Sequence, residues 1–224
     1  MSLENSTVII TGAAGSLGQA VCALAQSKGA TVIGLDIVDA RSIPHTNSYY
    51  QTDLLDLTAT QARFSSFGKV DALINIAGGF TMGEKAYDTS DEQFDLMFKV
   101  NVTTLRNTIK AAVPAMRLQQ RGTIVNIGAL GAVAGQADMG AYCAAKSTVM
   151  RLTESLSEEL KADGINVNAV LPSIIDTPPN REAMPEANFA DWVAPEKLAE
   201  VICFLASDAA SAVHGALIPV KGLV

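Results

Sequence analysis

The sequence predicts an α/β fold in which a parallel sheet of about seven strands carries helices on both faces. Short apolar, β-branched runs alternate with helical patterns along the whole 224-residue chain. Strands that are apolar along their full length are typical of parallel sheets buried on both sides. No repeat, low-complexity segment or charged linker interrupts the alternation. We therefore expect residues 1–224 to form one doubly wound domain.

The expected elements follow one another in the order that such a sheet requires. Strands are predicted at Thr7–Ile10, Thr31–Leu35, Tyr49–Gln51, Val70–Asn75, Thr123–Ile127, Ile165–Leu171 and Ala216–Val220. Helices are predicted at Ser16–Lys28, Thr58–Phe67, Asp91–Gln119, Met139–Lys161 and Pro195–Ala206, with Pro114 bending the third.

Residues 172–193 show no clear periodicity and contain four prolines. A long loop inside a compact domain is usually functional, so we expect a lid over the substrate. In the functional interpretation Met184, Phe189 and Trp192 cover the reacting groups and exclude water. In the alternative interpretation the segment is a surface loop whose Phe189 and Trp192 only pack on the core.

Composition narrows the class of function. Hydrophobic residues make up 49% of the chain and charged residues 17%, which is typical of a globular protein. The net charge is -7 and no Lys/Arg cluster occurs, so neither nucleic acid nor an anionic membrane is an expected partner. The N-terminus lacks a signal-peptide pattern, and no apolar run could span a bilayer. We therefore expect a cytoplasmic protein with neither of these partners.

The three cysteines, Cys22, Cys143 and Cys203, are far apart in the sequence. Their spacing matches no metal site, so no metal is expected, and a disulfide framework is improbable. We interpret them as small buried hydrophobes.

A glycine-rich turn follows the first strand. Glycines stand at every third position in Thr11-Gly12-Ala13-Ala14-Gly15-Ser16-Leu17-Gly18. The first allows a sharp turn, the second lets the backbone approach a pyrophosphate, and the third lets the helix pack close to the sheet. The helix N-terminus adds free N–H groups and partial positive charge. The predicted phosphate-binding residues are Gly12, Ala14, Gly15, Ser16, Leu17 and Gly18, and the predicted fold is Rossmann-like.

Asp36 ends the second strand and is a candidate for ribose binding. It lies 18 positions after Gly18, near the ~20 expected for the carboxylate that holds a ribose 2′-hydroxyl. A 2′-phosphate would be repelled there, so NADH is favoured over NADPH, although nearby Arg41 could soften that preference. The alternative is a solvated aspartate in a turn.

Tyr142 and Lys146 lie four residues apart in the helix predicted at Met139–Lys161, and therefore on one face of it. A lysine cation close to a phenol favours the phenolate and lowers the tyrosine pKa toward working pH. Such a tyrosine can exchange a proton with an oxygen or nitrogen atom of a substrate that receives a hydride.

Taken together, these motifs and their order resemble the short-chain dehydrogenase/reductase family along nearly the whole chain. The resemblance implies that Tyr142 is the catalytic acid or base and that Lys146 lowers its pKa and binds the nicotinamide ribose. It implies that Asn101, in Val100-Asn101-Val102, holds a water of a proton relay. Further cofactor contacts are implied at Asp53, Leu54, Asn75, Ala77, Gly78, Pro172, Ile175 and Thr177. It also implies a homodimer or homotetramer joined through the two long helices.

Three positions depart from the family pattern. Ser16 replaces a loop glycine, which Gly15 supplies one position earlier, and Ser173 replaces the glycine after Pro172. The third departure is larger, because Ala129 stands where the family's catalytic serine usually lies and residues 128–139 contain no hydroxyl group. Losing one preorganised donor of this kind costs about 2.7–4 kcal/mol in a carbonyl reduction.

One branch of the family also lacks this serine. The segment from Asp176 to Trp192, read with Leu171-Pro172, resembles the corresponding segment of the quinonoid dihydropteridine reductases, as do Leu35–Asp39 and Ala77–Phe80. That branch reduces a quinonoid dihydropterin with NADH, and such a substrate is reactive enough to need only a tyrosine proton donor. Asn101, in contrast, belongs to the general family pattern.

Three functions therefore remain open at this stage. The first is a dihydropteridine reductase-like activity, and the second is the reduction of another carbonyl, imine or quinone. The third is a non-catalytic NAD-binding regulator on the same fold. The presence of both Tyr142 and Lys146 argues against the third, since a protein that only binds NAD has no need of both.

Overall fold

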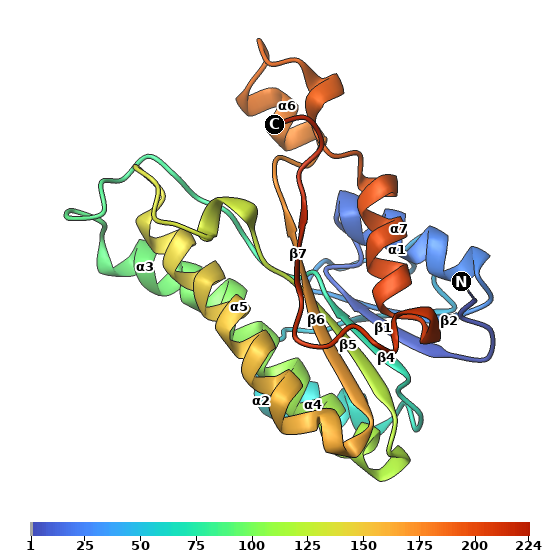
Figure 1. Ribbon diagram of the computed structural model, residues 1–224. Helices are drawn as coiled ribbons and strands as arrows, with labels where there is room; N and C mark the ends of the chain where they lie inside the picture. Colours follow the sequence, from blue (N-terminus) through green and yellow to red (C-terminus); the bar gives the residue numbers. More distant parts are fainter. Residues whose placement is uncertain (1) are drawn as a thin grey trace.

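The computed structural model describes residues 2–224 and contains one seven-stranded sheet (Figure 1). The strands are β1 Thr7–Thr11, β2 Thr31–Asp36, β3 Ser48–Gln51, β4 Ala72–Asn75, β5 Gly122–Ile127, β6 Ile165–Pro172 and β7 Leu217–Val220. They lie in the order β3-β2-β1-β4-β5-β6-β7, and every neighbouring pair is parallel. The predicted single-domain, Rossmann-like α/β fold is confirmed.

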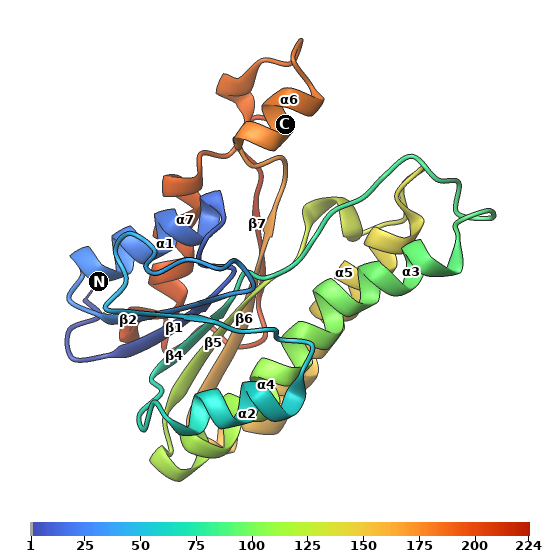
Figure 2. The same cartoon turned by 180° about the vertical axis from the view of Figure 1, so that it is seen from behind.

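Two helical layers cover the two faces of this sheet. Helices α1 Ser16–Ser27 and α7 Pro195–Leu205 lie together on one face. Helices α2 Leu57–Ser65, α4 Thr104–Gln119 and α5 Gly140–Leu160 cover the other, as both ribbon views show (Figures 1 and 2). Within β1, Val8 and Ile10 join the first core cluster and Ile9 joins the second. This alternation explains why the strands are apolar on both sides.

The long helix predicted at Asp91–Gln119 is interrupted in the structure. It consists of α3 Asp91–Phe98, a π-helical segment at Lys99–Thr103 and α4, which continues through Pro114. The irregular segment thus lies about three helical turns before Pro114, where the helix was expected to bend. Single π-helical turns occur frequently at functional sites, and this one contains Asn101.

The segment expected to be a loop also contains regular structure. Helix α6 occupies Pro178–Ala183, and a 3₁₀ turn follows at Phe189–Asp191. Thr177 caps α6 through its side chain, and the prolines stand in the first turn, where a missing N–H costs nothing. A helix of only six residues is too short to show the helical periodicity of apolar residues in the sequence, so α6 was not predicted.

A buried polar network ties the sheet to the helices at the carboxyl ends of β4 and β5. The Asn75 amide donates to Asn126 Oδ1 at 2.9 Å, and the Asn126 amide donates to Thr153 Oγ1 on α5 at 2.9 Å. The Thr108 hydroxyl on α4 donates to Asn75 Oδ1 at 2.7 Å. Every member of the network is almost completely buried, so the network fixes the register of these elements.

Within residues 2–224, no helix combines the length and the apolar character needed to cross a bilayer. All three cysteines are buried and free, in agreement with their interpretation as small hydrophobes.

Candidate active site

Packing requires two of the three glycines in the turn after β1. Gly12 has φ +67°, and a Cβ there would lie 2.8 Å from the Ala77 backbone nitrogen. A Cβ at Gly18 would lie only 2.0 Å from the Gly12 carbonyl oxygen. A Cβ at Gly15 meets nothing closer than 3.5 Å, so Gly15 is not required by packing. The turn therefore offers, at Gly15 and the first turn of α1, the cradle that a pyrophosphate needs.

Asp36 points back toward this turn. Its Oδ2 accepts a hydrogen bond from the Ala14 backbone N–H at 2.9 Å, and its Oδ1 accepts one from Val38 at 3.2 Å. The carboxylate is thus held beside the start of α1, at the end of β2. The residues fit a dinucleotide whose pyrophosphate lies at the helix N-terminus and whose ribose lies against this carboxylate.

Two of the predicted cofactor contacts, Asp53 and Leu54, make hydrogen bonds within the protein. The Asp53 carboxylate accepts a hydrogen bond from the Leu55 N–H at 2.9 Å and so stabilises the turn before α2. Leu54 is buried, and its carbonyl accepts from the Asn107 amide at 2.9 Å. Both residues nevertheless lie just beyond the end of β3, on the edge of the sheet where the strands end.

The segment after β4 lies close to the glycine turn. The Thr11 hydroxyl oxygen accepts hydrogen bonds from the backbone N–H groups of Ile76 and Ala77, both at 3.1 Å. The Asn75 side chain belongs to the buried network described above, so in the structure it joins β4 to β5 and α4. Ala77 and Gly78 are left at the carboxyl edge, beside Gly12.

Asn101 and Lys146 meet at Gly78. A Cβ on Gly78 would lie 2.7 Å from Asn101 Oδ1 and 3.5 Å from Lys146 Nζ, so only glycine leaves room for both side chains. The π-helical segment aims Asn101 at the loop after β4, where its amide is hydrogen-bonded to both backbone groups of Gly79 at 3.2 and 3.0 Å. The structure thus brings together three residues that are 68 positions apart from first to last.

Lys146 is a buried cation. Its Nζ donates to the Ile127 carbonyl at the end of β5 at 2.8 Å, and its side chain is 6% exposed. Burial penalises the ammonium form and lowers the pKa of Lys146 to about 8. This lysine can therefore gain or lose its proton near physiological pH.

Tyr142 does not show the lowered pKa that the sequence predicted. Burial raises its pKa to about 12, because the phenolate loses hydration, and Cys143 adds a smaller effect in the same direction. The Lys146 ammonium is hydrogen-bonded to the Ile127 carbonyl, which draws it to the end of β5. In this arrangement Tyr142 is a protonated donor over the whole physiological range, and its ring packs edge-on against Phe80 with centroids 4.9 Å apart.

The position of the missing serine is apolar. Ala129 is 5% exposed and belongs to a hydrophobic cluster with Ala132, Cys143, Met150 and Leu171, against which Tyr142 also packs. Residues 128–139 therefore supply no side-chain hydroxyl group, and the hydroxyl-bearing side chain that packs against this cluster is Tyr142.

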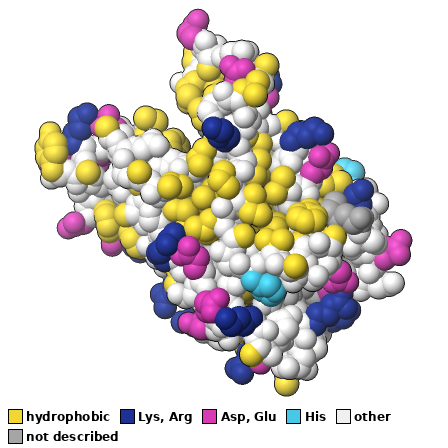
Figure 3. All heavy atoms as spheres, viewed as in Figure 1, with side chains coloured by type: hydrophobic (Ala, Val, Ile, Leu, Met, Phe, Trp, Pro, Cys, Tyr) yellow, Lys and Arg dark blue, Asp and Glu magenta, His cyan; other side chains and the backbone are white. Residues whose placement is uncertain are grey.

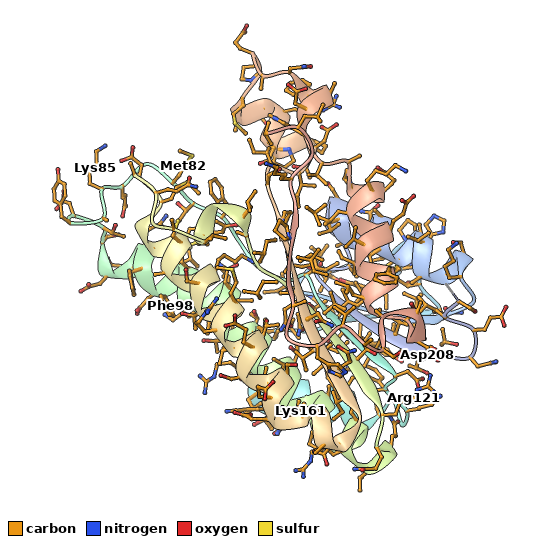
Figure 4. The ribbon with its side chains drawn as sticks, viewed as in Figure 1. Met82, Lys85, Phe98, Arg121, Lys161 and Asp208 are labelled. Carbon is orange, nitrogen blue, oxygen red and sulfur yellow. The ribbon has the colours of Figure 1, made fainter. Side chains whose placement is uncertain are left out.

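A small hollow, which the sequence did not predict, lies beside Tyr142. Two parts of the chain line it: Thr81, Met82, Glu84 and Thr89 from the loop before α3 together with Gln93 of α3, and Asp138 and Met139 from the loop before α5 together with Gly140 and Ala141 of α5. An ion pair joins Lys85 Nζ to Asp138 Oδ1 at 2.6 Å and holds the loops together. Figure 4 shows Met82 and Lys85 at one tip of the molecule, far from Arg121 and Asp208. Loop-to-loop contacts of this kind leave no periodic signal.

The 172–193 segment forms a small folded unit above the carboxyl edge. Asp176 accepts two hydrogen bonds from Arg181, at 2.5 and 2.7 Å, and the guanidinium lies 4.7 Å from the Phe189 ring centroid. Phe189 packs on Trp192, which is buried. In Figure 3 a notch separates this lobe from the lobe formed by the loop that precedes α3, and hydrophobic side chains gather below the notch. Pro172, Ile175 and Thr177 lie at the base of the unit.

Comparisons with a family model and with known proteins all point to the same family. The model for short chain dehydrogenase matches residues 6–188. The chain is 31% identical over 243 residues to the 3-oxoacyl-(acyl-carrier-protein) reductase FabG of Thermotoga maritima, covering 99% of this chain and 98% of the relative.

Two solved structures extend this comparison. One, from Beutenbergia cavernae, is described as an NAD(P)-dependent gluconate 5-dehydrogenase and holds NADP; it has a TM-score of 0.89 at 28% identity, covering 99% and 97% of the two chains. Carveol dehydrogenase from Mycobacterium avium, in complex with NAD, has a TM-score of 0.88 at 25% identity, covering 98% and 97%.

Two glycines of the turn should respond differently to substitution. Gly18→Ala should lower the free energy of unfolding by more than about 1 kcal/mol, because its Cβ overlaps the Gly12 carbonyl. Gly15→Ala should leave stability within about 0.5 kcal/mol and weaken NADH binding about tenfold, because its Cβ points into the phosphate cradle. Urea unfolding and a fluorescence titration measure the two quantities. Equal effects of both variants on stability would contradict this assignment.

Proposed function

Because the chain belongs to the short-chain dehydrogenase family of NAD(P)-dependent oxidoreductases, we propose that it uses NADH to reduce a small, electron-poor acceptor of the quinonoid dihydropterin type. The observation that carries this proposal is the apolar environment of Ala129. A site that lacks a hydroxyl donor at this position polarises a plain carbonyl poorly, whereas an acceptor that is already electron-poor needs only a proton.

Each part of the site has a role in this proposal. Gly12, Ala14, Gly15, Ser16, Leu17 and Gly18 would hold the pyrophosphate, and Asp36 the adenosine ribose. Asn75, Ala77, Gly78, Asp53, Leu54, Pro172, Ile175 and Thr177 would complete the cofactor site. When bound there, NADH supplies a hydride to the acceptor.

The protein's own residues would supply the proton and the charge. Tyr142 donates its phenolic proton to the atom of the acceptor that gains negative charge. Lys146, held at the Ile127 carbonyl in the structure, is the cation nearest to Gly78 and would stabilise the phenolate as it forms. Asn101 orders the Gly79 backbone beside it and would hold the water through which Tyr142 is reprotonated.

Reduction of another carbonyl, imine or quinone is the second candidate function. The similarity to a reductase of 3-oxoacyl groups, which are ketones, favours it. In this alternative a group outside residues 128–139 must polarise the carbonyl. We further propose a cytoplasmic setting, because the three buried cysteines are free.

Introducing the missing hydroxyl distinguishes the two candidates. We expect Ala129→Ser to raise kcat/KM for a simple aldehyde by about 100-fold, since one preorganised donor is worth ~100- to 1,000-fold. Turnover of a quinonoid dihydropterin should change by less than about twofold. A native protein that reduces the aldehyde rapidly and gains nothing from Ala129→Ser would show that another donor already acts there.

The pH dependence of kcat should follow the protonation of Lys146. Its ammonium is present below its pKa of about 8 and is lost above it. Tyr142, with a pKa of about 12, stays protonated throughout this range. We therefore expect kcat for reduction to be constant below pH 8 and to fall about tenfold per pH unit above it. A rate that stays constant to pH 10 would contradict this role for Lys146.

Tyr142→Phe is the matched control for the pH dependence of kcat. It should bind NADH with an unchanged Kd and lose about 100- to 10,000-fold in turnover at every pH, because only the proton donor is removed. Undiminished turnover would show that Tyr142 is not the proton donor.

Asp36 should determine the choice of cofactor. We expect the native protein to bind NADH more tightly than NADPH, because the carboxylate repels a 2′-phosphate. Asp36→Ala should reduce that preference at least about tenfold, equivalent to about 1.4 kcal/mol. Calorimetric titration of both cofactors measures the ratio. An unchanged ratio would assign Asp36 to the local turn alone.

We also propose a homodimer or homotetramer joined through α4 and α5. These helices lie side by side on the outer face of the molecule (Figure 2), and Ala111 and Ala144 remain partly exposed on them. Light scattering should give two or four times the 23.4 kDa mass of the chain. A monomeric mass would contradict the proposal.

A further inference from the structure

The C-terminal tail lies against the base of the 172–193 unit. Both ribbon views place the C-terminus beside α6 (Figures 1 and 2). At the start of the unit, the Ser173 N–H donates to the Val220 carbonyl at 3.0 Å and the Ser173 hydroxyl donates to the Lys221 carbonyl at 2.7 Å. At its end, the Leu223 N–H donates to the Asp191 carbonyl at 2.9 Å. The tail therefore contacts both stems of the unit.

The two stems are also joined directly. The Val193 N–H donates to the Ile174 carbonyl and the Asp176 N–H to the Val193 carbonyl, both at 2.9 Å. Three backbone segments thus run together at the base, and residues 177–190 form the part that stands above it. Thr177, one of the predicted cofactor contacts, stands where this base ends.

The conformation of the C-terminal tail requires a glycine at position 222. Its φ is +62°, and a Cβ there would lie 2.6 Å from the Asp191 carbonyl oxygen and 3.3 Å from the Trp192 carbonyl carbon. Any other residue would push the tail away from Asp191 and break the Leu223 hydrogen bond. Trp192, 7% exposed, would then lose part of its cover.

We propose that Gly222 is a positioning residue: through it, the C-terminal tail fixes the base of the 172–193 unit and so places Thr177 and Trp192 at the cofactor end of the sheet. This inference rests on the proposed function, in which the 172–193 unit supplies cofactor contacts, and on the expectation from the sequence that this unit is a lid over the site. It makes the last three residues necessary for full activity, although none of them belongs to the proposed catalytic or cofactor-binding set.

The chain contains a matched control and a built-in probe. Gly68 has a similar φ of +71°, but a Cβ there meets nothing within 4 Å, so Gly68→Ala imposes the backbone strain without the clash. Trp192 is the only tryptophan in the chain, so its fluorescence reports the base of the lid alone. Deletion of residues 222–224 removes the tail contacts at Asp191 and leaves β7 complete.

The first experiment is the emission spectrum of Trp192 in the protein by itself. Gly222→Ala and the deletion should each shift the emission to longer wavelength, while Gly68→Ala should not. The second is NADH-dependent turnover, in which Gly222→Ala should raise KM for the acceptor about tenfold or more, because small displacements of positioning groups are costly. The thermal midpoint should fall no further than in Gly68→Ala.

The role of Gly222 and the proposed function are tested by different measurements. Spectra and KM values for Gly222→Ala and the deletion that match those of Gly68→Ala would overturn the role of Gly222. If the native protein reduces no acceptor, the proposed function fails, yet the Trp192 spectra still decide whether the tail holds the base of the unit.

Discussion

The hydrogen bonds among Asn75, Asn126 and Thr153 hold the functional end of this molecule together. They join β4 and β5 to α5 inside the core, and Thr108 adds α4 to the same network. Because each polar group is almost completely buried, an unpaired member would cost about 1–3 kcal/mol. This cost keeps α5 in one register against the sheet. Tyr142 and Lys146 stand on that helix, and Gly78 follows β4, so the geometry of the site depends on the network.

Burial then determines the chemistry available at the site. It lowers the pKa of Lys146 to about 8 and raises that of Tyr142 to about 12, so at neutral pH helix α5 carries both a lysine cation and a fully protonated phenol. This is the protonation state that a reductase needs before the reaction. Ala129 supplies no hydroxyl group, and in the proposed function this favours an acceptor whose own electronic structure makes reduction easy.

The fold and much of the site could be predicted from the sequence, because strands, helices and the glycine turn have local signatures. Gly12 and Gly18 are required by backbone overlap at close range, which the spacing of glycines indicates directly. The π-helical segment around Asn101, the six-residue α6 and the ion pair between Lys85 and Asp138 could not be predicted. Each depends on contacts between distant segments. The same holds for the Tyr142 pKa, since a Tyr-x-x-x-Lys spacing does not reveal burial.

The most direct test of the central claim is NADH oxidation by the native protein with three acceptors in parallel: a quinonoid dihydropterin, a simple aldehyde and an ortho-quinone. The account predicts rapid turnover with the dihydropterin, slow turnover with the aldehyde, and weaker activity with NADPH than with NADH. Rapid turnover of the aldehyde without turnover of the dihydropterin would contradict it. Binding of NADH without turnover of any acceptor would instead favour a regulatory protein on the same fold.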